Sequence, residues 1–205
     1  MNIGNCYFNL KEYEKAIESY LKQKEVCLKS GANQKGNYNL GAGQSEFNLA
    51  KTYYKTKEFQ KSLDLLNQWY STCEKVNSLG PVESTLIGER QSLIYIAKIH
   101  FRQENYEKSI ETFEKLEKIC TNVESKIRCI LGICKSKIKL SLFDGAASTL
   151  ERGRKIEENN FGLELMRLRL MLNTEKKEMA IEMLKKMLEN AKEEKQKKKI
   201  QKLLK

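Results

Sequence analysis

Few residues of this chain have the types and spacing that catalysis or metal binding requires. There is one histidine, His100, and none of the six cysteines forms a Cys-x-x-Cys pair. Structural metals and disulfide frameworks normally need such clustered ligands. We therefore expect no metal site and no cofactor, and we expect reduced, partly buried thiols of the kind found in cytosolic proteins.

Two glycine-containing segments match phosphate-binding loops only in part. Gly41-Ala-Gly43 has Glu46 in place of a third glycine and follows no predicted strand, and Gly132-Ile-Cys-Lys-Ser136 lacks the glycine before its lysine. Both loop types need these glycines because the backbone must approach the phosphates closely. With His100 in a position that tyrosines hold elsewhere in the chain, we predict no catalytic residue and no enzyme.

A recurring block shows what positions the remaining polar residues. Residues 11–20 (KEYEKAIESY) return as residues 57–66 (KEFQKSLDLL) and 104–113 (ENYEKSIETF), with weaker copies at 142–150 and 176–184. The small residue of each copy falls at Ala16, Ser62, Ser109, Ala146 and Ala180, at intervals of 46, 47, 37 and 34 residues. Such a period predicts an array of stacked helix pairs, which usually forms a binding surface and not a reaction centre.

A second pattern precedes the first three blocks: an apolar residue, a small residue, and a ring three positions later. It reads Ile3-Gly4 with Tyr7, Leu49-Ala50 with Tyr53, and Ile96-Ala97 with His100; in the fourth unit either Leu131-Gly132 or Ile133-Cys134 fits. Small residues let two helices cross closely, and rings fill the space around the crossing. The residues expected to pack the repeats are Gly4, Tyr7, Ala16, Tyr20, Ala50, Tyr53, Ser62, Ala97, Ser109, Phe113, Ala146 and Ala180.

Composition favours an all-α chain. The only proline is Pro81, and no stretch alternates in the manner of a strand. We expect helix-pair units near residues 1–30, 38–77, 85–120, 123–158 and 161–190, followed by a basic C-terminal helix or tail at 191–205. The long intervals predict helices of ~20 residues near 58–77 and 85–102, with breaks at residues 30–36 and 77–82.

These patterns resemble the tetratricopeptide repeat (TPR), and Ile3-Gly4 with Tyr7, Ala16 and Tyr20 is the closest copy. The resemblance implies a right-handed superhelical solenoid of about five antiparallel helix pairs that binds proteins without catalysis. The long repeats are similar in length to the Leu-Gly-Asn-repeat adaptors and to some axonemal repeat proteins. The opening tryptophan and the closing proline of the family pattern are absent. Since Met1 falls inside the first helix of a repeat, we expect preceding sequence or a neighbouring protein at that end.

In this family the first helix of each pair lines a concave groove. Positions one and five after the small residue are basic or amide in the first three units, and a ring precedes the second of them. The fourth unit fits this pattern if its small residue is Cys134, and the fifth, which has lost the small residue, places Arg169 and Asn173 at these positions. Asn5, Asn48, Lys51 and Arg102 match in part the set with which family members clamp a peptide carboxylate. We predict instead an acidic extended or helical partner segment, the alternative being a merely solvated face. The expected groove residues are Asn5, Asn9, Asn48, Lys51, Tyr54, Lys55, Lys98, Phe101, Arg102, Lys135, Lys139 and Arg169.

The net charge of +11 leaves several functions open. The first hypothesis is a non-catalytic protein-protein interaction scaffold; the second is a structural subunit of a large cytoskeletal or ciliary (axonemal) assembly. The third, an RNA-binding helical repeat, is disfavoured because arginines are few and glutamates are interspersed among the lysines. We expect the lysine-rich tail either to cap the last repeat with Ile200, Leu203 and Leu204, or to bind an acidic surface. No apolar run reaches membrane-spanning length, and we expect a cytoplasmic location, with a cytoskeletal or ciliary one as the alternative.

Overall fold

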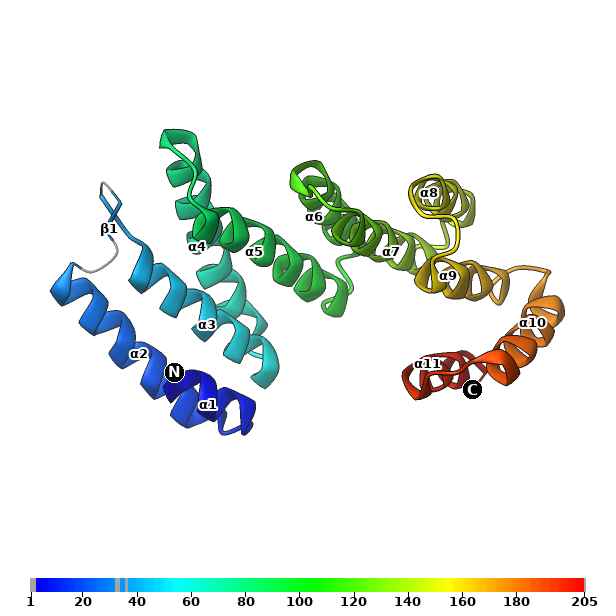
Figure 1. Cartoon of the computed structure of the whole chain (residues 1–205), viewed down its shortest axis with the longest axis horizontal. Helices are drawn as coiled ribbons and strands as arrows, with labels where there is room; N and C mark the ends of the chain where they lie inside the picture. Colours follow the sequence, from blue (N-terminus) through cyan, green and yellow to red (C-terminus); the bar gives the residue numbers. More distant parts are fainter. Residues whose placement is uncertain (1–2, 32–33, 36, 205) are drawn as a thin grey trace. The chain divides into compact units, whose positions relative to one another are not determined.

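The computed structural model describes residues 3–31, 34–35 and 37–204. Met1, Asn2, Ala32, Asn33, Gly36 and Lys205 lie outside the described residues, as do the parts of the predicted first unit, break and tail that fall on them. The described residues form eleven helices, which confirms the all-α fold class (Figure 1). The sole departure among them is a hairpin of two short antiparallel strands, β1 (Gln34–Lys35), which lies in the predicted break at residues 30–36, and β2 (Tyr38–Asn39), which follows it.

The helices follow one another in pairs joined by short turns. The pairs are α1 (Ile3–Asn9) with α2 (Tyr13–Ser30), α3 (Leu40–Thr56) with α4 (Phe59–Leu79), α5 (Glu83–Arg102) with α6 (Tyr106–Ile119), α7 (Val123–Lys139) with α8 (Phe143–Ile156), and α9 (Phe161–Met171) with α10 (Lys177–Asn190), followed by α11 (Glu194–Leu204). None of these described helices combines the length and the apolar character needed to cross a membrane.

The chain divides into two compact units, unit 1 (Met1–Lys108) and unit 2 (Ser109–Lys205). In unit 1, α3 packs against α2 and α4, and α5 packs against α4 and α3. In unit 2, α7 packs against α8 and α9, and α10 packs against α9 and α11. The first helices α3 and α5 therefore lie beside one another in unit 1, and the first helices α7 and α9 do so in unit 2 (Figure 1).

The turn inside each of the first four pairs has the same construction. One residue adopts left-handed backbone geometry: Lys11, Lys57, Glu104 or Ser141, with φ between 59° and 67°. The next amide then donates to the carbonyl five residues back, at Tyr7, Tyr53, His100 or Lys137, over 2.9 Å in each turn. Lys137 is thus the counterpart of Tyr7, and the small residue three positions earlier is Cys134. The structure selects Ile133-Cys134 as the register of the fourth unit.

The small residues of the repeat lie where helices cross. Ala16, Ala50, Ser62, Ala97, Ser109, Ala146 and Ala180 have no exposed surface. Some also carry bonds between helices: the Ser62 hydroxyl donates to the Ala50 carbonyl over 2.7 Å, and Ser136 donates to Ser109 over 3.2 Å. Gly4 is buried against the ring of Tyr20. Tyr20 and Phe113 are buried, whereas Tyr7 and Tyr53 are half-buried.

The long repeat intervals reflect long helices in unit 1. Helices α2 to α5 contain 18, 17, 21 and 20 residues, whereas the helices from α6 onward contain 11 to 17. Trp69, which is 1% exposed, packs in this extension between Gly43 of α3 and Gly88 of α5. Further along, Asn77 accepts from the Thr85 hydroxyl over 2.6 Å, so α4 and α5 stay joined close to their connecting loop.

Candidate functional site

The first helices of unit 1 carry cations that lie over aromatic rings. On α3, the Lys51 ammonium lies 5.2 Å from the centre of the Phe8 ring and 5.7 Å from that of Phe47. On α5, the Lys98 ammonium lies 5.1 Å from the centre of the Tyr95 ring. Because a ring face is electron-rich, each contact holds the cation in place and stabilises it.

Helices α3 and α5 are linked on this same surface. Arg102 donates from Nε to the Tyr54 hydroxyl over 2.9 Å, and its guanidinium carbon lies 5.4 Å from the centre of that ring. Tyr54 packs edge to face on Tyr95 at 5.3 Å, and Tyr95 does the same on Phe47 at 5.9 Å. We call the resulting cluster the unit 1 basic-aromatic surface: Phe8, Phe47, Lys51, Tyr54, Tyr95, Lys98 and Arg102.

Burial shapes the electrostatics of this surface. Phe47 is only 2% exposed and forms its floor, while Lys51 and Tyr95 are half-buried. Partial burial, and then the charge of Lys55, lower the pKa of the Lys51 ammonium. Burial, and then the neighbouring Tyr54, raise the pKa of the Tyr95 hydroxyl. The Lys51 charge is therefore held in partly desolvated surroundings, where an anion interacts with it more strongly than it would in bulk water, whereas Lys98 and Arg102 are exposed.

The other predicted groove residues of unit 1 have different surroundings. The side-chain oxygen of Asn5 accepts from the Tyr20 hydroxyl over 2.6 Å, and Asn48 is buried at 8% exposure. Phe101 packs edge to face on Tyr106, the first residue of α6, at 5.3 Å. Asn9 and Lys55 are exposed. The Asn5 amide is thus bonded within its own helix pair, and Asn48 belongs to the packed interior of α3.

A buried carboxylate next to this surface already has a partner. Glu46 of α3 is 7% exposed and pairs with Lys24 of α2 over 2.7 Å. Because Lys24 of α2 neutralises the charge of Glu46, this carboxylate is not available to neutralise Lys51. The basic character of the surface is therefore retained.

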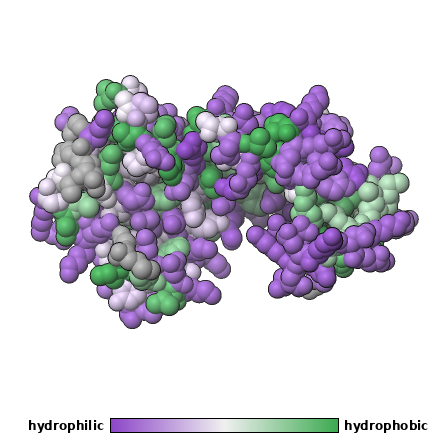
Figure 2. Space-filling model, in the orientation of Figure 1, coloured by the Kyte–Doolittle hydropathy of each residue, from purple (hydrophilic) through white to green (hydrophobic). Residues whose placement is uncertain are grey.

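In unit 2 the predicted groove residues separate into two groups. Lys135 of α7 and Arg169 of α9 line one cavity together with Lys199 and Lys202 of α11. Lys139 is exposed at the end of α7 and is not among the residues that line this cavity. Figure 2 shows hydrophilic side chains gathered over α11, which lies at the lower right of that view.

Sequence reasoning missed Phe47, Tyr95, Lys199 and Lys202. Phe47 lies four residues before Lys51, and Tyr95 lies three before Lys98. Residues at these spacings share a helix face, so projecting the helix back from each lysine would have found both rings. Lys199 and Lys202 belong to a segment with no counterpart in the repeat, so the repeat register could not place them.

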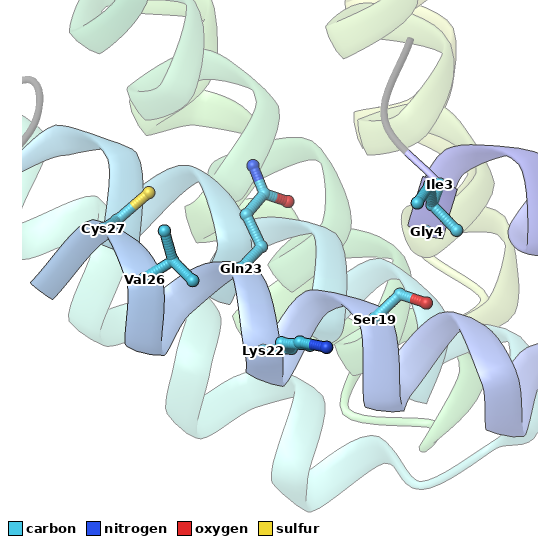
Figure 3. Close-up of a pocket in the computed structure, with 7 residues that line it drawn as sticks. All are labelled: Ile3, Gly4, Ser19, Lys22, Gln23, Val26 and Cys27. Atoms are coloured by element: carbon cyan, nitrogen blue, oxygen red, sulfur yellow. The ribbon is translucent and has the colours of Figure 1, made fainter. Parts of the chain in front are cut away.

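A further hollow of about 440 Å³ lies between α1 and α2. Figure 3 shows Ile3 and Gly4 of α1 on one side, with Gln23, Val26 and Cys27 of α2 on the other. Lys22 is the one charged side chain among its lining residues. This hollow is open and mostly apolar.

Cysteine chemistry follows burial. The six thiols are free, and Cys73, Cys120, Cys129 and Cys134 are buried. Burial raises the pKa of Cys73 and of Cys134 to about 12, which keeps both thiols protonated. Folding also brings the sulfurs of Cys120 and Cys129 to 4.0 Å from each other, a proximity that the sequence spacing did not suggest. In the part of the chain that the structure describes, no group of three or more His, Cys, Asp or Glu could hold a metal ion.

Comparison with known proteins agrees with the fold of stacked helix pairs. The tetratricopeptide repeat family model matches residues 1–28 and 91–122, and no curated protein matches the chain. The solved apo form of the quorum sensor NprR from B. thuringiensis is similar over 99% of this chain and 57% of that chain, with 13% identity and a TM-score of 0.75.

Two further solved structures share the fold at similar identity. The TPR-like repeats of a putative kinesin light chain from Podosopora anserina match 97% of this chain and 92% of that chain, with 14% identity and a TM-score of 0.67. Yeast Tom70 matches 98% of this chain and 37% of that chain, with 15% identity and a TM-score of 0.64. Residues 1–28 and 91–122 thus match the tetratricopeptide-repeat model, and the chain shares the helix-pair fold of these solved structures.

Proposed function

We propose that this chain is a non-catalytic protein-protein interaction scaffold whose first helices bind an acidic, extended or helical segment of a partner protein. The single observation that carries the proposal is the unit 1 basic-aromatic surface. It joins three cations and four rings from α1, α3 and α5.

The chemistry of this surface suits a peptide. Exposed ion pairs contribute only ~0–1 kcal/mol each, so the rings must supply much of the affinity by burying apolar side chains. The lysines and the arginine would accelerate encounter with an acidic partner and disfavour basic ones. Because the cations are already held over rings, less side-chain freedom is lost when the partner binds.

The test reverses the three charges of the surface. Lys51, Lys98 and Arg102 are replaced by Glu, and binding of labelled acidic peptides is followed by stopped flow and by anisotropy. The control reverses Lys75, Lys115 and Lys118, which are exposed on the second helices α4 and α6, so that net charge changes equally. We expect the surface variant to lose about tenfold or more in affinity and to associate more slowly, and the control to keep most of both.

Two outcomes would contradict the proposal. Affinity and association rate could be unchanged in the surface variant, in which case these charges are merely solvated. Alternatively, single-stranded RNA could bind more tightly than the acidic peptides, with the steep salt dependence of phosphate contacts. The second result would favour the RNA-binding alternative.

A further inference from the structure

Unit 2 contains a cavity of about 360 Å³ formed by α7, α9 and α11. Its apolar lining includes Leu131, Met166 and Leu203, one from each helix. This volume lies at the lower end of the range of ~300–1,000 Å³ that is usual for ligand pockets. The cavity is therefore large enough to take a side chain or a short piece of a partner, and not a whole structural element.

Four cations surround this apolar lining, and no carboxylate is among the residues that line it. They are Lys135, Arg169, Lys199 and Lys202. Partial burial, and then the charges of Arg169, Lys199 and Lys202, lower the pKa of the Lys135 ammonium, although part of that side chain remains in contact with solvent. Like charges held together in this way repel one another, and an anionic ligand would relieve the repulsion.

Two arginines elsewhere in unit 2, Arg167 and Arg152, are paired with acids. Arg167, on the same helix as Arg169, bonds both oxygens of Glu164, at 2.6 and 2.9 Å. Arg152 bonds Glu117 over 2.8 Å. The four cations of the cavity thus differ from these neighbours in their surroundings, which are other cations and apolar side chains.

Helix α11 uses two sets of residues for two purposes. Ile200 has no exposed surface and packs with Leu168 and Leu184 of α9 and α10. Lys199 and Lys202 instead line the cavity, and the Lys199 ammonium also lies 5.8 Å from the centre of the Phe161 ring. The same helix therefore closes the apolar core and supplies half of the positive charge around the cavity.

We propose that this cavity binds an acidic peptide segment in which one apolar side chain is flanked by carboxylates. The apolar side chain would cover the leucine and methionine lining, and the carboxylates would meet the four cations. An inorganic anion would leave that lining uncovered. Single-stranded nucleic acid needs stacking rings, and none is among the residues that line the cavity. The acidic character of the ligand rests on the proposed function, but the site is a separate one.

The probe is a labelled peptide, Glu-Glu-Leu-Glu-Glu with both ends blocked, followed by anisotropy on the full chain. Lys199 and Lys202 are replaced together by Gln, and the matched control replaces Lys195 and Lys198, which are exposed on the same helix and do not line the cavity. We expect about a tenfold loss of affinity in the cavity variant and less than about twofold in the control. Since Ile200 is untouched and repulsion falls, the free cavity variant should melt no lower than the parent chain.

Further peptides and variants decide the matter. The inference is overturned if replacing Lys195 and Lys198 weakens peptide binding as much as replacing Lys199 and Lys202. It is also overturned if a peptide with Gln in place of each Glu binds as tightly, or if a peptide with Ser in place of the central Leu keeps the same affinity. Inorganic phosphate or single-stranded RNA competing as well as the peptide would also overturn it. If only the reversal of Lys51, Lys98 and Arg102 removes binding, the proposed function stands and the cavity inference fails. If only the replacement of Lys199 and Lys202 removes peptide binding, the cavity inference stands and the proposal for unit 1 fails.

Discussion

At the scale of single residues, the packing of Trp69 depends on two glycines, Gly43 and Gly88, which have no Cβ atom. A Cβ atom on Gly43 would collide with the six-membered ring of Trp69, and one on Gly88 would lie 2.7 Å from its Nε1. Gly43 belongs to the Gly-Ala-Gly segment of the sequence, so its glycine serves helix packing and not phosphate binding. Close packing of this kind leaves little room for relaxation.

We predict that Gly43→Ala lowers the free energy of unfolding by about 1–3 kcal/mol, as overpacked cores usually do. Gly145→Ala in α8 is the control, because its Cβ would meet only the flexible Lys137 side chain, at 3.5 Å or more. That control should gain about 0.5–1 kcal/mol from helix propensity. Urea unfolding followed by circular dichroism measures both changes. Equal stability of the Gly43 variant and the parent would show that the Trp69 ring moves aside without cost.

At the scale of helices and turns, the pairs were predictable because their signals are local. Small residues, rings and turn residues recur in phase, and neighbours along the chain become neighbours in space. The contacts that the sequence concealed join residues far apart along it. Lys24 with Glu46, Trp69 with two glycines, and Lys135 with the α11 lysines are examples. The residues of each such contact are not separated by the repeat interval, so the sequence pattern could not predict that they meet in the folded chain.

The left-handed turn residue gives a prediction at this scale. Lys57 has φ of 67°, a conformation that glycine adopts without the steric cost that a Cβ imposes. Lys57→Gly should therefore leave stability unchanged or raise it by up to about 1 kcal/mol. The same change at Lys75, exposed within α4, should cost about 1 kcal/mol. Thermal melts of the two variants compare the signs, and a clear loss at Lys57 would mean that its side chain stabilises the turn.

At the scale of the whole chain, the array needs a closed end. An array of helix pairs exposes the apolar face of its last pair unless a capping element covers it. In unit 2, α11 packs on α9 and α10 with Ile200, which is fully buried, and with the partly buried Leu203 and Leu204, so we predict that it is the capping element of this pair. The apolar residues of α11 that pack on α9 and α10 are thus different residues from the lysines that we propose to bind an acidic ligand.

Deleting residues 192–205 should expose the cluster around Leu168 and Leu184 and lower the midpoint of the thermal transition seen by circular dichroism. Ile200→Ala separates packing from charge, since it keeps every lysine; it should lower the free energy of unfolding by about 2–4 kcal/mol.

Trp69, the only tryptophan, lies in unit 1 and reports the unfolding of that unit by fluorescence. Because repeats interact mainly with their neighbours, the fluorescence transition should shift less than the dichroism transition. An unchanged dichroism midpoint in both variants would show that α11 is not the cap. The role of the helix would then lie in its lysines alone.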